Sequence, residues 1–154
     1  MNLRSLLLFA FSLLLLASAC KPRKVSTDPV PPVPPVAVVN PCGAALLKGK
    51  APESAMVSGL TNSLAGDCLE LKVSYGGGCE KHDFAMYWDG NWAESMPPQV
   101  NLFLYHNNHG DNCRALLNEK LVFDLQPVRY NGVGQVIVNI HAEGQKLQRA
   151  NYTY

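Results

Sequence analysis

The sequence predicts an all-β domain, an antiparallel sandwich or barrel-like fold of about seven strands that follows a signal peptide and a proline-rich tether. Three observations predict this organisation. Apolar and polar residues alternate with a period of two through much of residues 42–154, as they do in half-buried strands. Glycine, proline and asparagine mark turns between these runs. Seven of the eleven prolines gather in residues 21–41, which separates a tether from the domain.

The first residues have the pattern of a secretory signal peptide. Arg4 supplies a positive start, and residues 6–16 form a nearly pure apolar run of about eleven residues, within the ~7–15 that are usual for a signal-peptide core. A membrane-spanning helix needs roughly 20 apolar residues, so this run is too short to be one. We therefore expect residues 1–19 to be a signal peptide that is removed from the mature protein.

The letters ASAC at residues 17–20 resemble the lipobox of bacterial lipoproteins. The resemblance covers the first 20 residues, and it implies cleavage before Cys20, a diacylglycerol on the thiol of Cys20 and attachment to the membrane through this lipid. Lys21, in place of an aspartate, implies the outer membrane. Cleavage after Ala19 as in an ordinary secretory signal is the alternative. Cysteine parity favours lipidation, because modification of Cys20 leaves four of the five cysteines to pair.

Residues 20–41 are expected to be the lipidated cysteine and a proline-rich linker. Proline fixes φ and lacks a backbone donor, so this stretch cannot join the interior of a helix or sheet. Extended polyproline II, at ~3.1 Å per residue, gives the linker a reach of roughly 60 Å. Its basic residues beside the lipid, Lys21, Arg23 and Lys24, can contact anionic headgroups. A spacer is favoured over a PxxP ligand for a partner protein.

Seven runs in residues 42–154 have the period of a strand, and the first is the weakest. They are residues 54–61, 69–75, 82–88, 100–106, 121–125, 135–141 and 147–154. In the second run, Leu69, Leu71 and Val73 share one face and alternate with polar or charged residues.

The later runs repeat this alternation. The residues that share one face are Phe84, Met86 and Trp88; Val100, Leu102 and Leu104; Leu121, Phe123 and Leu125; and Val136, Val138 and Ile140. Residues 82–88 and 100–106 are expected to pair antiparallel through the long loop between them. Residues 147–154 are expected to close against 135–141 across a glycine turn.

Residues 111–120, DNCRALLNEK, fit two structures. Asp111 is a possible helix N-cap, and good helix formers follow it. Cys113, Ala115 and Leu117 nevertheless keep the parity of the strand at 121–125. The pattern favours a strand, or a single helical turn that enters a strand.

The antiparallel pairing of the third and fourth runs places the start of one beside the end of the other. His82 and His106 then lie at one end of the sheet with the same parity. Cys79 precedes the first of these two runs, and Asp111 and Cys113 follow the second. We therefore expect these five residues to meet in one corner of the domain.

Two chemistries suit this corner. In the first, Cys79 and Cys113 form a disulfide, the preceding glycines allow a tight path into it, and the histidines are structural, hydrogen-bonded to loop carbonyls or to Asp111. This interpretation is favoured because exported cysteines usually oxidise. Cys42 and Cys68 remain as an obvious second disulfide.

In the second chemistry, the corner binds zinc or copper. The spacings Cys79-x-x-His82 and His106-x-x-His109 suit these metals, and the site would be built mainly on the three histidines.

The corner also carries a resemblance. A GGC-x-x-H turn followed by H and then D-x-C is similar to a pattern in uncharacterised bacterial lipoproteins. The matching residues are Gly77, Gly78, Cys79, His82, His106, Asp111 and Cys113. The resemblance implies no activity.

Composition and motifs exclude several functions. A net charge of +1 without a basic patch gives no support to nucleic-acid binding. Disulfide pairing removes a cysteine nucleophile, and Ser95 lacks the G-x-S-x-G context of a hydrolase serine. His141 stands alone near a strand end and is expected at the surface, not in a catalytic site. No cofactor is expected.

The leading hypothesis is therefore a non-enzymatic protein, lipid-anchored in the bacterial cell envelope, that binds or supports another envelope component. The expected contact surface is the loop at 89–99, with Trp92 and Met96. In the alternative, Trp92 folds back as a lid on the core. A metal-binding lipoprotein and a small hydrolase with an unrecognised site are the other hypotheses.

Overall fold

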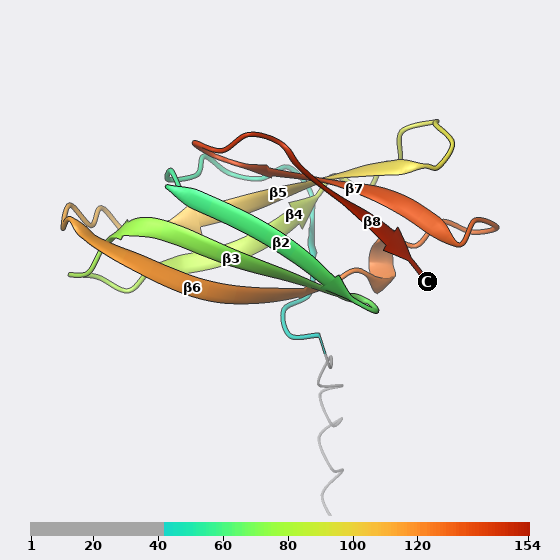
Figure 1. Ribbon diagram of the computed structural model, residues 1–154. Coiled ribbons are helices and arrows are strands. Elements are labelled where there is room, and N and C mark those ends of the chain that lie inside the picture. The colour runs from blue at the N-terminus through green and yellow to red at the C-terminus, as the bar shows by residue number, and fades with distance from the viewer. Residues whose placement is uncertain (1–41) are drawn as a thin grey trace, which may run out of the picture. The chain divides into compact units, whose positions relative to one another are not determined.

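The structure is a computed structural model that describes residues 42–154 (Figure 1). The signal peptide, Cys20 and the proline-rich linker lie outside the described residues. Among the residues that are described, no helix has the length and hydrophobicity needed to span a membrane.

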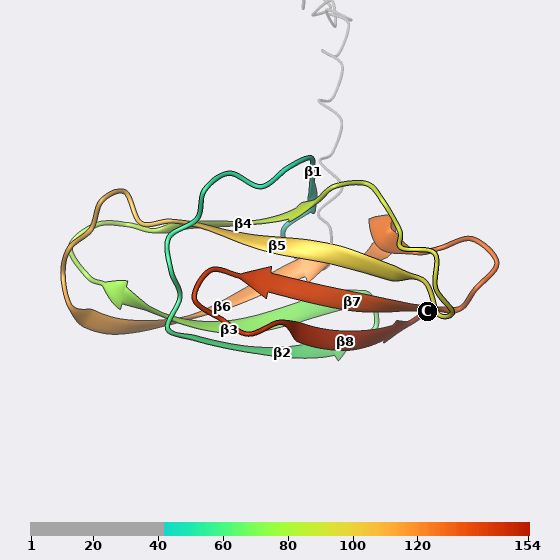
Figure 2. The same cartoon turned by 90° about the horizontal axis from the view of Figure 1, so that it is seen from above.

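Residues 42–154 form eight strands in two sheets, which confirms the prediction of an all-β sandwich. One sheet has five strands in the order β1-β4-β5-β7-β8, and the other has three in the order β2-β3-β6 (Figures 1 and 2). The strands are β1 (Leu47–Lys48), β2 (Gly59–Ala65), β3 (Cys68–Gly77), β4 (Asp83–Trp88), β5 (Gln99–Asn107), β6 (Ala115–Asp124), β7 (Gln135–Ala142) and β8 (Gln148–Thr153).

The five-stranded sheet is mixed, not purely antiparallel. The expected antiparallel pairs β4–β5 and β7–β8 are present. However, β5 pairs parallel with β7, and the short β1 pairs parallel with β4. The chain leaves β5, passes through β6 in the other sheet and returns as β7, so the parallel pair has the long crossover connection that such pairs require.

The core lies between the sheets and is formed by alternate residues of the longer strands. In β3, Leu69, Leu71 and Val73 are almost completely buried, while Lys72 between them is exposed. The facing sheet contributes Met86, Val100, Leu102, Leu104, Val136, Val138, Ile140 and Tyr152. Each fully buried aliphatic side chain contributes about 1.5–3 kcal/mol to folding. Because the buried residues alternate along the chain, extended strands can place all of them on the core face.

The ambiguous segment at 111–120 enters β6 without a helical turn. β6 pairs with ten consecutive residues of β3, from Gly77 to Cys68, so tertiary pairing overrides the helix propensity of Ala115, Leu116 and Leu117. β2 begins at Gly59, later than the expected run at 54–61.

The two long sides of the sandwich are closed differently. On one side, the segment at 42–48 joins the sheets: Ala44 bridges to Phe123 of β6, and Leu47 pairs with Tyr87 of β4. On the other side, β2 and β8 approach each other, and Asn62 Nδ2 donates to Gln148 Oε1 at 3.5 Å (Figure 2).

Candidate functional site

The predicted corner is assembled in the structure. We call it the histidine corner, formed by Cys79, His82, His106, Asp111 and Cys113. In the β4–β5 register, Phe84 is opposite His106, which places His82 beside the end of β5. His82 Nδ1 lies 2.8 Å from His106 Nε2, and their residues are 7% and 2% exposed.

Asp111 is the centre of this corner. Its Oδ2 accepts hydrogen bonds from the amides of Gly78 at 2.8 Å, Cys79 at 2.9 Å and Glu80 at 3.0 Å. Its Oδ1 accepts the amide of Cys113 at 2.8 Å, and His82 Nε2 lies 3.2 Å from Oδ2. The amides of Glu80, Cys113 and Cys79 hold the pKa of this carboxyl far below its usual range. One carboxylate therefore ties two loops together.

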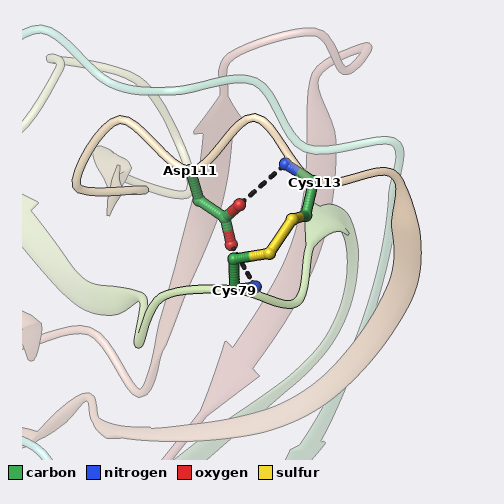
Figure 3. A group of neighbouring side chains, drawn as sticks. All are labelled: Cys79, Asp111 and Cys113. Carbon is green, nitrogen blue, oxygen red and sulfur yellow. Dashed lines mark hydrogen bonds between the residues drawn. A yellow bond between two sulfur atoms is a disulfide. The ribbon is translucent and has the colours of Figure 1, made fainter.

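Both predicted disulfides are present. Cys79 and Cys113 are bonded with their Cα atoms 5.9 Å apart, and Figure 3 shows the Asp111 carboxylate between the two loops that they join. Cys42 and Cys68 are bonded with a Cα–Cα distance of 5.0 Å. Since every cysteine in residues 42–154 is paired, this part of the chain offers no thiolate nucleophile.

The hydrogen-bond chain fixes which nitrogen carries each proton when both rings are neutral. Asp111 is an acceptor, so His82 Nε2–H donates to it and His82 Nδ1 accepts from His106 Nε2–H. His106 Nδ1 is buried and has no hydrogen-bond partner in residues 42–154. Burial, and then repulsion from His82, lower the pKa of His106, while the backbone of Met56 and Ala55 opposes this shift.

Aromatic rings enclose the two histidines. Phe84 stacks on His106 with ring centroids 4.5 Å apart. Tyr75 lies 4.8 Å from the ring of His82 and 5.1 Å from the ring of His106. The pair is therefore shielded from solvent by apolar surface, which is the environment of a structural polar cluster.

The glycines before Cys79 have a steric function. A Cβ on Gly77 would lie 2.6 Å from His82 Nε2 and 3.1 Å from Asp111 Oδ2. Gly78 has φ of +118°, a conformation that side chains disfavour. Gly77 therefore excludes a side chain because the loop passes directly against the imidazole and the carboxylate, and Gly78 does so because of its backbone conformation.

The structure does not assemble the alternative metal site. His109 points away from the corner, and its Nε2 lies 2.6 Å from Asp83 Oδ2 in an exposed pair. Cys79, Asp111 and Cys113 lie close enough to hold an ion. Their sulfurs are bonded to each other, however, and the carboxylate already accepts amide hydrogen bonds on both oxygens. The donor set therefore fits a disulfide-stapled corner better than a zinc or copper site.

The loop between β4 and β5 has a defined conformation. Trp92 packs on Trp88 with ring centroids 4.9 Å apart and donates from Nε1 to the carbonyl of Val128 at 3.1 Å, so it serves as the lid on the core. Met96 is 86% exposed at the loop tip. A hollow of about 530 Å³ lies along this loop, between Met96 and Tyr130.

Hydrogen bonds within the loop support Met96. Ser95 Oγ donates to the carbonyl of Pro97 at 2.7 Å, and the amide of Ala93 donates to the carbonyl of Gln99 at 2.8 Å. Ser95 Oγ also accepts from Gln99 Nε2 at 3.2 Å, so its hydroxyl is engaged in hydrogen bonds within the loop.

A second polar cluster, the arginine cluster, was not predicted from the sequence. Asp67 lies in the β2–β3 turn and accepts from Arg129 Nη2 and from the hydroxyl of Tyr152, each at 2.5 Å. Burial and the bond to Asp67 raise the pKa of Tyr152 to about 12. The bonds from Tyr152 and Arg129 lower the pKa of Asp67. Nothing in the sequence signals this cluster, because its three members are isolated residues far apart in the chain.

His141 lies half-buried on the outer face of the five-stranded sheet. Its ring stacks on Phe103 at 4.7 Å, and its Nε2 lies 3.1 Å from Asn101 Oδ1. Burial lowers its pKa. These contacts agree with a surface position braced by its neighbours.

The fold and the site define a class: a small β-sandwich with two disulfides and an internal Asp-His-His cluster. No protein-family model and no curated protein matches the sequence. A NigD-like immunity protein from Bacteroides caccae has a similar solved structure, with 14% identity and a TM-score of 0.50; the match covers 72% of this chain and 64% of that one. This likeness shows the fold alone.

Two further solved structures have lower TM-scores. A DUF1344 protein of unknown function from Bacteroides vulgatus has 13% identity and a TM-score of 0.48, covering 71% of this chain and 56% of that one. A putative toxin related protein from Parabacteroides distasonis has 17% identity and a TM-score of 0.47, covering 71% and 61%. This chain spans less than two thirds of the length of each of these three proteins.

Proposed function

We propose that this chain is a lipid-anchored, non-enzymatic binding module of the bacterial cell envelope, attached to the outer membrane through Cys20. The observation that carries this proposal is that the chemically reactive side chains of the corner are buried and hydrogen-bonded within the fold. His82, His106 and Asp111 are nearly inaccessible, and their hydrogen bonds run to one another and to loop amides. A catalytic acid or base needs access to a substrate proton, which this corner does not offer.

The contact surface of the proposed module is the loop at 89–99. Met96 exposes an apolar, adaptable side chain on a braced loop, next to the hollow that Tyr130 lines. A loop held in one conformation loses little entropy when it binds. It should therefore bind more tightly than a flexible loop of the same composition. The partner is another protein of the envelope or a ligand presented there.

Site-specific photo-cross-linking in cells tests this surface. A photo-reactive amino acid replaces Met96 in the full-length chain, and the matched control carries it at Met56, which is also exposed, at 68%. We expect a discrete cross-linked product from position 96 and none from position 56. Met96→Asp should weaken capture of that product's partner about tenfold, or about 1.4 kcal/mol. Equal products from both positions, or none from either, would refute the proposal that the loop at 89–99 is the contact surface.

The anchor has its own test. Cys20→Ser should leave the protein unprocessed or release it from the membrane fraction. Normal processing together with full membrane retention of Cys20→Ser would exclude lipid attachment at this residue.

A further inference from the structure

Strand β6 has a long backbone edge that the described part of the chain leaves largely unpaired. It pairs with β3 over ten consecutive residues without a bulge. On its other side, the contact within residues 42–154 is the single bridge from Ala44 to Phe123. As far as residues 42–154 are concerned, the stretch at 115–121 is therefore an open edge.

The hydrogen bonds of Ala44 show which backbone groups point outward. The amide of Ala44 donates to the carbonyl of Val122 at 3.0 Å, and the amide of Asp124 donates to the carbonyl of Ala44 at 3.1 Å. In a regular strand, residues of the same parity direct both their N–H and C=O groups to the same side. The backbone groups of Leu116, Asn118 and Lys120 thus point to the open edge.

Several devices that usually protect an edge strand are missing from this stretch. Natural edges are kept short or carry proline, bulges or charged side chains, lysine above all. The stretch at 115–121 has seven residues, no proline and no bulge. Its one lysine, Lys120, is 59% exposed and forms an ion pair with Glu70 of the neighbouring strand at 2.6 Å. Leu116 is 66% exposed beside it. By contrast, β1 has two residues, and β2 and β8 lie against each other.

We propose that β6 pairs antiparallel with β6 of a second copy of this chain, with Asn118 on the two-fold axis. Asn118 is the midpoint of the open stretch and has outward backbone groups, so the axis falls on a hydrogen-bonded pair. The two three-stranded sheets become one continuous sheet of six strands.

The side chains opposite one another in this register are compatible. Leu116 meets Lys120 of the partner subunit, and Leu117 meets Glu119 of the partner subunit. No two like charges are directly opposite, which would destabilise the pair. The pairing ends at residue 121, just before the carbonyl of Val122 that Ala44 already occupies. This self-complementarity favours a second copy over an unrelated strand.

Cross-linking of Asn118→Cys in the full-length chain tests the register. Hydrogen-bonded antiparallel pairs have Cα atoms about 5.5 Å apart, within the range of about 4.4–6.8 Å that disulfides span. We expect a covalent dimer linked from 118 to 118 on peptide mapping. Thr61→Cys, exposed on the other edge strand β2 of the same sheet, is the control and should stay monomeric.

Proline substitution supplies a second measurement. Asn118→Pro removes an outward N–H and should halve the mass of the detergent-solubilised protein while the β-sheet circular dichroism is kept. Glu119→Pro removes an inward N–H that pairs with β3, so it should unfold β6 as well. A monomeric wild type, together with an Asn118→Cys variant that forms no 118–118 cross-link, overturns the proposal. So does a cross-link from residue 118 to a different protein, or a dimer that Asn118→Pro leaves intact.

Discussion

Each end of the sandwich has a disulfide beside an aspartate, but the two aspartates differ in their burial and in the groups that bind them. β3 begins at one end, where Cys68 bonds Cys42 and Asp67 holds the arginine cluster. It leads at the other end into the histidine corner, where a disulfide also lies beside an aspartate. The Asp111 side chain is 0% exposed and is bound mainly by backbone amides. The Asp67 side chain is 22% exposed and is bound by the side chains of Arg129 and Tyr152.

This difference predicts which end holds the fold more strongly. An enclosed carboxylate that accepts several amides fixes the path of the backbone, and removal of its partners leaves buried polar groups unsatisfied. Exposed ion pairs such as that of Arg129 and Asp67 are screened by water and contribute little. We therefore expect the histidine corner to be the more sensitive end.

The largest effect is expected from loss of the disulfides. Each bridge closes a similar loop, with sequence separations of 26 and 34, so chain entropy predicts about 3–4 kcal/mol for either. The double variant Cys79→Ser with Cys113→Ser should lose more than Cys42→Ser with Cys68→Ser, because it also loosens the amides that bind Asp111. Urea unfolding of both measures this. Equal losses in the free energy of unfolding would contradict the expectation that the histidine corner is the more sensitive end.

His82→Ala should have the next largest effect. It removes the partner of His106 and one donor to Asp111, and a buried group that loses its partner costs about 1–3 kcal/mol. Thermal unfolding measures this cost. His109→Ala is the matched control, because its ring forms only an exposed pair, and its melting temperature should stay within error of wild type. A similar loss in both variants would argue against a special role for the corner.

Gly77→Ala tests the close approach of the loop. The added methyl would clash with His82 Nε2, and overpacking of this kind costs typically 1–3 kcal/mol. Gly76→Ala is the control, since a Cβ there meets no atom within 4 Å. Chemical unfolding should separate the two. A stable Gly77→Ala protein would mean that the loop can move away from the histidine.

Acid should weaken the fold below neutral pH. The pKa of His106 is lower when folded than its ordinary value of 6.5, so the unfolded chain binds the proton more tightly. The stability contributed by neutral His106 is thus present above 6.5 and is lost as the pH falls below it. Melting temperatures between pH 8 and pH 5 measure this, and His106→Gln should flatten that part of the profile. An unchanged profile would show that His106 does not titrate in this range.

The smallest effect is expected at the arginine cluster. Arg129→Ala should cost at most about 1 kcal/mol, because the pair with Asp67 is partly exposed. Raising the salt concentration should reduce even this difference. A loss as large as that of His82→Ala would reverse the comparison between the two ends.

The histidine corner was predictable because it depends on strand parity and on one antiparallel pair. Once β4 and β5 are placed side by side, His82 and His106 must meet, and Cys79 and Cys113 are brought together with them. Alternation shows which face a residue takes. It does not show which strand lies next to it, so the parallel pairing of β5 with β7 was missed.

Other features have no local signal at all. Asp67 and Tyr152 are far apart in the chain, and their contact follows from the packing of β8 against the β2–β3 turn. The bridge from Ala44 to Phe123 similarly depends on how the sheets are joined. Trp92 had two predicted positions, and its hydrogen bond to Val128 selects the core lid.

The central claim is that the histidine corner is a structural staple and not a metal site. Native mass spectrometry of the mature full-length protein, before and after reduction, tests it most directly. We expect two disulfides, no retained zinc or copper, and no alkylation of Cys79 or Cys113 until a reductant is added. One equivalent of metal that survives dialysis, with cysteines that become alkylatable when a chelator removes it, would contradict the claim.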